Sequence, residues 1–417
     1  RVVLARSSAN SPADERLPVS GPLTGLRVLD LGTRIAAPFC AGLLGEQGAE
    51  VIKIEQPGNG DFMRDIGPFA PDENGEDYSL FWSVEGRGRK SVTIDLRTSD
   101  GQLLLMRLAE TADVLVENFR PGTLEKWNIG PNSLNDRLIT VRISSFGQDG
   151  PLSPRPGLDR VGIGFGGLLH LTGYPDRPPV RVGVTISDYL TGVFSAHAAV
   201  AALYGRDARG GTGVVIDASL YGSSLRVLEW TLAAYDRLGT IRNREGNQLA
   251  NSAPLDNYPT ADGKYVCIVA GSDANFARLS AAMEMTELIT DERFARLSDR
   301  VEHHQEINDM VAKWTTSLSA DEVERRCAAK DVPVATAATA ADIFANAHIA
   351  ERSDLVSVND PVLGPIRQQA PYPRVAGTTP EAPVGAPKLG QHTREVLSDL
   401  LGLSDTQLDD LSERGVV

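Results

Sequence analysis

Residues 25–55 show a strand–helix–strand pattern that limits the possible folds, GLRVLDLGTRIAAPFCAGLLGEQGAEVIKIE. Val and Leu are dense up to Gly32, helix formers follow from Pro38, and β-branched residues return after Gly48. The pattern recurs in KSVTIDL, in a leucine-rich helix that starts near Ser99, and in DVLVEN. Since parallel strands need long and usually helical crossovers, this alternation predicts an α/β fold with a parallel sheet covered by helices on both faces.

The chain changes character after about residue 240. Residues 240–262 are polar and rich in turn formers, which predicts a linker or an active-site loop. The strand GKYVCIVAG and the helices after it predict a smaller α/β unit. After about residue 345 the chain runs through a proline-rich stretch to a last helix.

Composition narrows the kinds of partner. With 41 basic and 55 acidic residues the net charge is −14, which argues against a nucleic-acid or anionic-membrane surface. We find no apolar run near the roughly 20 residues that span a bilayer and no signal-peptide core, so we expect a cytoplasmic protein. Three scattered cysteines and the adjacent pair His303 and His304 predict no metal site. An anionic ligand therefore needs a locally basic pocket. Candidates for it are Arg87, Arg89 and Lys90, with Arg97 a few residues on, and a solvated charged turn before a strand is the other interpretation of these residues.

Dinucleotide binding is disfavoured despite the architecture. The turn after the first strand, LGTRIAAP, lacks the glycine spacing that lets a pyrophosphate approach a helix N-terminus, and GIGFGG at 162–167 has the wrong spacing.

Asp159 follows a Pro-Gly pair and precedes a glycine-rich apolar run. One interpretation is a helix cap that accepts backbone N–H bonds. The other is a carboxylate that backbone amides keep ionised while apolar neighbours exclude water, which suits a covalent nucleophile. The residues alone leave both open.

Six stretches in order together resemble the class III coenzyme A transferases, the family that includes formyl-CoA transferase. They are the segment from Gly25 to Arg64, KSVTIDL, VENFRPGTLEKWNIG, ISSFGQDGP, PGLD followed by GGLLHLTG, and APKLGQHTREVL. The likeness runs from about Gly21 to Val417.

The resemblance implies an enzyme in which Asp159 attacks an acyl-CoA thioester, giving an acyl-aspartyl anhydride and then an aspartyl-CoA thioester, before a carboxylic acid accepts CoA. It implies CoA as a substrate and no tightly bound cofactor. The CoA contacts carried over by position, with the basic residues expected to meet phosphate, are Ile35, Ala36, Gln56, Arg89, Ile94, Arg97, Asn118, Phe119 and Lys126. Gln56 stands where a relative has Arg, which weakens that one contact.

The family fold implies a Rossmann-like large domain, with a parallel sheet built from both chain ends, a smaller α/β domain, and an interlocked homodimer. The expected boundaries are a flexible N-terminus at 1–20, the large domain at 21–225 and 345–417, a linker and active-site loop at 226–262, the small domain at 263–330 and a second linker at 331–344. Formyl-CoA transferase closes a glycine run over its intermediates. This chain lacks that run, so we expect Gly246 and Asn247 to do the covering and do not expect formyl transfer to oxalate.

Two other functions stay open. The same family fold hosts an acyl-CoA racemase that uses a His-Asp pair, but here Leu158 precedes Asp159 and no histidine occurs before His170. A non-catalytic CoA-binding dimer is the second alternative. The segment from Gly167 to Gly192 looks more like that of family members using dicarboxylic acids, and Arg34 or Arg181 would meet the second carboxylate.

Overall fold

The computed structural model describes residues 21–374 and 383–417. The expected flexible segment 1–20 lies outside the described residues. The chain divides into two compact units. Unit 1 comprises the described parts of Arg1–Leu158, Ser187–Ser223 and Val356–Val417, and unit 2 comprises Asp159–Ile186 and Ser224–Leu355.

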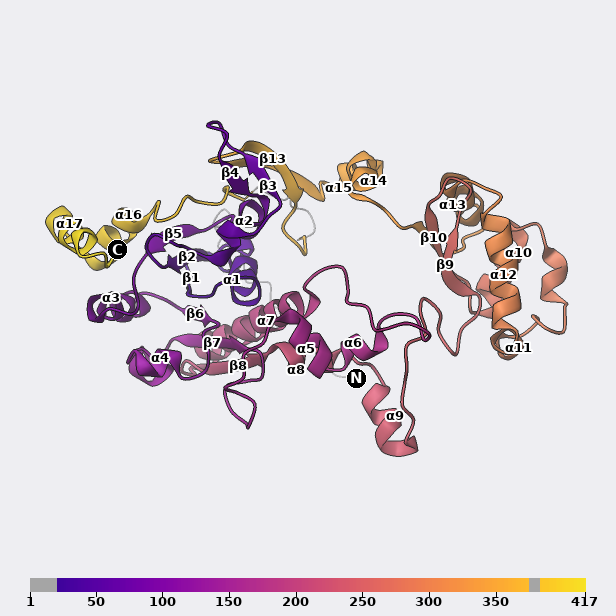
Figure 1. Cartoon of the computed structure of the whole chain (residues 1–417), viewed down its shortest axis with the longest axis horizontal. Coiled ribbons are helices and arrows are strands. Elements are labelled where there is room, and N and C mark those ends of the chain that lie inside the picture. Colours follow the sequence, from indigo (N-terminus) through magenta and orange to yellow (C-terminus); the bar gives the residue numbers. More distant parts are fainter. Residues whose placement is uncertain (1–20, 375–382) are drawn as a thin grey trace, which may run out of the picture. The chain divides into compact units, whose positions relative to one another are not determined.

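A six-stranded sheet forms the centre of unit 1 (Figure 1). Its order is β5-β2-β1-β6-β7-β8, and every neighbouring pair is parallel. The strands are β1 (Arg27–Asp30), β2 (Glu50–Glu55), β5 (Lys90–Thr93), β6 (Val114–Glu117), β7 (Ile139–Ser144) and β8 (Val215–Ser219). The α/β class and the parallel sheet expected from the sequence are confirmed.

Helices cover both faces of this sheet. Successive residues of a strand point to opposite faces, so Val28 belongs to one core cluster and Leu29 to the other. The unit 1 helices are α1 (Ala36–Glu46), α2 (Leu80–Glu85), α3 (Ser99–Ala109), α4 (Thr123–Lys126), α7 (Ile186–Arg209), α8 (Leu220–Arg226), α16 (Thr393–Leu401) and α17 (Asp405–Glu413). α1 and α7 pack on the Val28 side, whereas α3, α16 and α17 pack on the Leu29 side.

The prediction that both chain ends supply the parallel sheet is wrong. All six strands lie between Arg27 and Ser219. The C-terminal residues instead place Val396, Leu397 and Leu408 of α16 and α17 in the core. An amphipathic helix can bury its apolar side on a sheet without adding a strand. The remaining strands of unit 1 form two separate pairs, β3 (Phe69–Pro71) with β4 (Asp77–Ser79) and β12 (Leu355–Asp360) with β13 (Gly364–Gln369).

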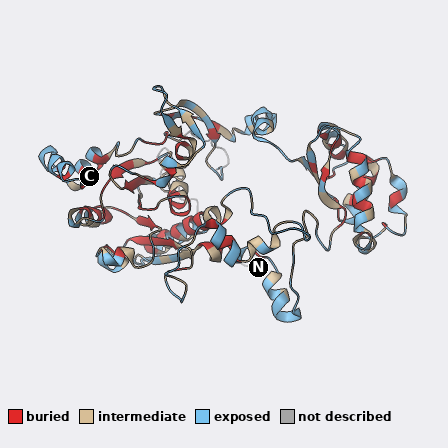
Figure 2. Cartoon of the chain, in the orientation of Figure 1, coloured by how far each residue is buried: buried red, intermediate tan, exposed pale blue. Residues whose placement is uncertain are grey.

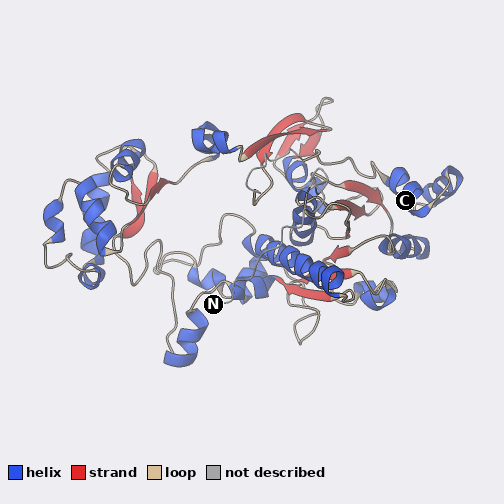
Figure 3. Cartoon of the chain, turned by 180° about the vertical axis from the view of Figure 1, so that it is seen from behind, coloured by secondary structure: helices blue, strands red, loops and turns tan. Residues whose placement is uncertain are grey.

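The helix α7 is an exception to our expectation that no apolar run is long enough to span a bilayer. By length and composition alone it could cross a membrane. Its Ala196, Ala199 and Leu203 are buried in the core with α1, as expected for a core helix of a globular unit. Figure 3 shows this long helix beside the strands of the sheet.

Unit 2 contains a three-stranded antiparallel sheet in the order β11-β10-β9, with its own apolar core. The strands are β9 (Leu255–Pro259), β10 (Tyr265–Val269) and β11 (Val334–Thr336). The helices are α5 (Asp159–Phe165), α6 (Leu168–Leu171), α9 (Thr231–Leu238), α10 (Asp273–Ala282), α11 (Leu297–Glu302), α12 (His304–Thr315), α13 (Ala320–Ala328), α14 (Ala340–Ala345) and α15 (Ala347–Arg352). Thus the segment 331–344, expected as a linker, contributes a strand, and residues 159–186 group with unit 2 rather than with the sheet.

Candidate active site

The carboxyl edge of the six-stranded sheet contains its switch point. Counted along the chain, the parallel strands have the spatial order 3-2-1-4-5-6, so the direction of winding reverses between β1 and β6. In open α/β sheets the loops diverge at that point and leave a crevice for ligands outside the carboxyl ends of the strands. Here Asn118, just after β6, forms two hydrogen bonds with the loop after β1. Its Oδ1 accepts from Thr33 N at 2.9 Å and its Nδ2 donates to Thr33 O at 2.7 Å.

The positions expected to bind CoA gather on this edge, with Arg89 as the exception. Ile35 and Ala36 follow β1, Gln56 follows β2, Ile94 and Arg97 follow β5, and Asn118, Phe119 and Lys126 follow β6. Ile35, Ala36 and Ile94 are buried, and Phe119 packs edge-on against Trp127. Their part in CoA binding stays a prediction.

The three expected phosphate-binding cations differ in availability. Arg89 precedes β5 and is buried, where its Nη1 lies 2.6 Å from Asp30 Oδ2 and its Nη2 donates to Pro38 O. This geometry favours a structural role that joins β5 to the first turn of α1. Arg97 is exposed and paired with Asp95, and Lys126 is exposed at the end of α4. Exposed cations at the carboxyl edge remain the better candidates for a phosphate.

A buried charge cluster beneath the loop after β1 was missed by sequence reasoning. Lys53 of β2 is 0% exposed; its Nζ lies 2.8 Å from Asp61 Oδ2 and 3.5 Å from Asp30 Oδ2 and also donates to Gly32 O. Asp61 Oδ1 accepts from Thr33 Oγ1, Arg34 N and Met63 N at 2.9–3.2 Å. The cluster therefore fixes the backbone at the switch point. A lysine inside the apolar strand VIKIE was the available signal.

The opposite charges in this cluster stabilise one another's ionised forms. Burial alone would lower the pKa of Lys53, but the carboxylates of Asp30, Asp61 and Glu55 hold that pKa above its usual value. Burial alone would raise the pKa of Asp61, yet the ammonium of Lys53 and its backbone hydrogen bonds hold it below its usual value. Both groups are therefore charged at neutral pH.

Asp159 is the first residue of α5 and is 6% exposed. Gly162 and Ile163 of the same helix are also buried, whereas the apolar neighbours Leu158, Val161 and Phe165 are 41–56% exposed. Gly167 then takes a left-handed conformation, with φ of 86°, and starts α6. Such a carboxylate has the burial that a covalent nucleophile requires. Asp159 belongs to unit 2, whereas the nine positions expected to bind CoA belong to unit 1.

The segment expected to cover the intermediates lies against the residues that follow α6. Gly246 N donates to Gly173 O at 3.0 Å, and Asn247 Nδ2 donates to Tyr174 Oη at 3.0 Å. Arg244 donates to His170 O and Tyr174 O. Within unit 2, this segment is thus joined to the stretch that leads from Asp159 through α5 and α6.

A second residue that sequence reasoning missed is Gln148, in the loop after β7. Its backbone N–H donates to Asp217 Oδ2 at 2.9 Å, while its side-chain Nε2 is buried and contacts no hydrogen-bond partner among the described residues. A buried amide without a partner is costly, so such a group is a candidate for contact with substrate.

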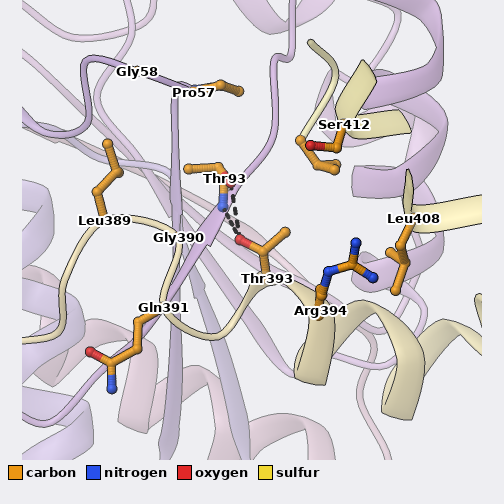
Figure 4. Close-up of a pocket in the computed structure, with 11 residues that line it drawn as sticks. Pro57, Gly58, Thr93, Leu389, Gly390, Gln391, Thr393, Arg394, Leu408 and Ser412 are labelled. Atoms are coloured by element: carbon orange, nitrogen blue, oxygen red, sulfur yellow. Dashed lines mark hydrogen bonds between the residues drawn. The ribbon is translucent and has the colours of Figure 1, made fainter. Parts of the chain in front are cut away.

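A hollow of about 450 Å³ opens beside the carboxyl ends of β2 and β5 (Figure 4). Pro57 and Gly58, next to Gln56, line one side, and Thr93, next to Ile94, lines another. The C-terminal stretch is attached here, because Thr393 Oγ1 accepts from Thr93 N at 2.9 Å. Across the described ranges no group of His, Cys, Asp or Glu side chains is arranged to hold a metal ion.

Comparisons with known proteins identify the family. The family model of CoA-transferase family III matches residues 23–393. A succinyl-CoA–D-citramalate CoA-transferase of Chloroflexus aurantiacus is 43% identical over 95% of this chain and 98% of its own length. A succinate–glutarate CoA-transferase of Agrobacterium fabrum is 34% identical over 91% of this chain and 96% of its own length.

A solved structure also resembles this chain in sequence and fold. The crystal structure of a CAIB/BAIF family protein from Brucella suis matches 91% of this chain and 99% of its own chain, with a TM-score of 0.81 and 34% identity. The chain therefore belongs to CoA-transferase family III and is a CoA-transferase.

Proposed function

We propose that the chain transfers CoA from succinyl-CoA, or a similar acyl-CoA, to a second dicarboxylic acid. The observation that carries this proposal is the near full-length similarity to enzymes named for succinyl-CoA with D-citramalate and for succinate with glutarate. The gathering of the expected CoA contacts at the carboxyl edge of a switch-point sheet supports it.

Asp159 is the proposed nucleophile. Its carboxylate attacks the thioester carbonyl carbon, the C–S bond breaks, and an acyl-aspartyl anhydride and CoA thiolate form. The thiolate attacks the aspartyl carbonyl, which releases the donor acid and leaves an aspartyl-CoA thioester. The acceptor carboxylate then displaces CoA thiolate to give a second anhydride, and the thiolate attacks the acceptor carbonyl to give the new acyl-CoA and free Asp159. Burial of Asp159 protects each intermediate from water.

The test is a transfer assay on the purified chain with succinyl-CoA and a panel of citramalate, mesaconate and glutarate. Asp159→Asn keeps the shape of the side chain and removes the nucleophile, so the rate should fall on the order of 10³-fold or more. The matched control is Asp176→Asn, an exposed carboxylate of the same unit. Mass spectrometry of enzyme quenched during turnover should find an acyl or CoA adduct on the peptide that contains Asp159. Transfer at the normal rate by Asp159→Asn would exclude the mechanism.

We further propose that the active form is the interlocked homodimer. Helix α9 supports it, because none of its residues is buried in the single chain (Figure 2). Trp230, Leu232, Tyr235 and Leu238, on and just before this helix, are at least half exposed, which is unusual for a surface that stays in water. Light scattering should give twice the chain mass of 44.7 kDa, and a particle of one chain mass would contradict the dimer.

A further inference from the structure

Two side chains of the C-terminal stretch cover the outer edge of β5. Because β5 is the strand at one end of the six-stranded sheet, its outward backbone groups need partners from outside the sheet. Residues 390–393, here called the C-terminal segment, provide them. Ser91 N donates to His392 Nδ1 at 3.1 Å, and Ser91 O accepts from His392 N at 2.9 Å. Thr93 N donates to Thr393 Oγ1 at 2.9 Å (Figure 4).

The bond between Ser91 and His392 exists in one protonation state of the imidazole. A backbone N–H group can only donate, so this bond requires a His392 Nδ1 that carries no proton. Protonation places two N–H donors against each other and breaks the bond. Histidine is the side chain whose ordinary pKa allows this change at moderate acidity, so the contact between β5 and the C-terminal segment is sensitive to pH.

The charged groups that act on this imidazole come from α16 and β5. Burial lowers the pKa of His392 below its usual 6.5, Glu395 of α16 opposes that shift, and Lys90 of β5 adds to it. The other charged side chains on the elements packed here are paired, Glu50 with Lys90, Glu55 with Arg64, and Arg394 with Asp405 and Asp409. Since the folded-state pKa is lowered, the contact is complete above pH 6.5 and is lost progressively as pH falls from there through the folded-state value.

The carboxyl end of β5 leads directly to two expected CoA contacts. Ile94 follows Thr93, whose backbone N–H is bound by Thr393, and Arg97 comes shortly after it. The hollow of about 450 Å³ lies at the same place and is lined by both threonines. Release of the C-terminal segment therefore frees the end of the strand that carries these contacts.

We infer that His392 is a positioning residue for CoA, because its neutral imidazole holds the C-terminal segment on β5 and its protonation releases that segment and weakens CoA binding. The inference rests on the proposed function, since it takes Ile94 and Arg97 as CoA contacts. His392 acts through Ser91 and Thr93, and all of these residues belong to unit 1.

Two variants separate the hydrogen bond from the titration. In His392→Asn the side-chain Oδ1 is as many bonds from Cα as Nδ1 is, and it accepts from Ser91 N without titrating, whereas His392→Leu offers no acceptor. Between about pH 7.5 and about pH 5.5, the Kd of CoA measured by calorimetry should rise roughly 3- to 10-fold more in the wild type than in His392→Asn, because the binding-competent fraction falls. At about pH 7.5, His392→Leu should already bind CoA roughly 3- to 10-fold more weakly than the wild type, and His392→Asn should bind it nearly as well.

The comparison between variants is the readout, because a phosphate monoester of CoA itself titrates near about pH 6. His348→Asn, which changes an exposed histidine of α15, is the matched control and should keep the wild-type pH profile.

Hydrogen exchange tests the release without CoA. After correction for the intrinsic effect of pH, the wild-type peptide across β5 should lose protection between about pH 7.5 and about pH 5.5, while the peptide across the central strand β6 should not. In His392→Asn both peptides should stay protected.

Equal pH profiles of CoA binding in the wild type and His392→Asn overturn the inference. Unchanged protection of β5 in the wild type at the lower pH also overturns it. Failure of the proposed function looks different, as a wild type that binds no CoA even at the higher pH.

Discussion

Asn118 and Thr33 exchange two hydrogen bonds across the switch point of the sheet, one from each end of the amide of Asn118. They join the loops after β1 and β6, which the winding of the chain would otherwise separate. The expected CoA contacts at Ile35 and Ala36 therefore depend on a side chain that lies more than eighty residues away in sequence.

Removal of this amide should loosen the loop. In Asn118→Ala both hydrogen bonds are lost, and we expect a loss of about 1–3 kcal/mol in the free energy of unfolding, measured in urea. The KM for the acyl-CoA should rise as well. Asn135→Ala is the control, because Asn135 is only partly buried and its side chain accepts one local hydrogen bond, from Arg137 N. Equal stability of the two variants would contradict the bridging role of Asn118.

Loss of the buried ammonium of Lys53 should lower the free energy of unfolding more than loss of the Asn118 amide. Lys53→Met leaves the carboxylate of Asp61 buried without its cation, while Asp30 keeps Arg89, so unfolding should become about 3–5 kcal/mol easier. Adding Asp61→Asn to Lys53→Met should cost less than the two single changes summed, since the orphaned charge is then removed. Strict additivity in the urea titrations of the four proteins would mean that the two side chains do not interact.

Acid should weaken unit 1 through Glu55. Burial alone would raise the pKa of Glu55, but the hydrogen bonds and charge of Arg64, with help from Lys53 and Ser91, hold that pKa below its usual 4.5. A depressed folded-state pKa contributes stability that is present above pH 4.5 and is lost as pH falls through the folded-state value. Stability measured from pH 7 downward should therefore drop below pH 4.5, and Glu55→Gln should flatten that drop. The same loss of stability below pH 4.5 in the wild type and in Glu55→Gln would contradict the role given to Glu55.

Close contact between α7 and α1 should make the fold sensitive to any side chain at Gly192. A Cβ on Gly192 would lie 2.8 Å from Phe39 Cδ1 and 3.0 Å from Ala36 O, so Gly192→Ala should force the helices apart and destabilise the fold by about 1–3 kcal/mol. Gly205 on the same helix has no neighbour within 4 Å of an added Cβ, so Gly205→Ala should stabilise by up to about 1 kcal/mol. Thermal unfolding of the two variants should shift in opposite directions.

Much of the fold was readable along the chain. The alternation of apolar strands and helices predicted the parallel sheet, and the segment from Arg27 to Lys126 contains the expected strands and helices in order. The pair β3–β4 and the helix α2, between β2 and β5, were not predicted. The CoA contacts expected from the family resemblance lie after the ends of strands, except Arg89, which precedes β5. The ion pair of Arg89 with the buried Asp30 was not predicted, because the two residues are remote in sequence. Hydrophobic periodicity is a local property, so it predicts elements well but not their distant partners.

Hydrophobic periodicity predicted the α/β class, and the family resemblance indicated a CoA-transferase and its candidate nucleophile, because both signals lie in neighbouring residues. The folded structure was needed to show that all strands of the six-stranded sheet come from Arg27–Ser219, that Lys53 lies beneath the loop after β1, and that Arg34 stacks on Phe62 without an ion-pair partner among the described residues. Strand pairing, burial and charge pairing join residues far apart in the chain, and their energies depend on distances that exist only in the folded protein.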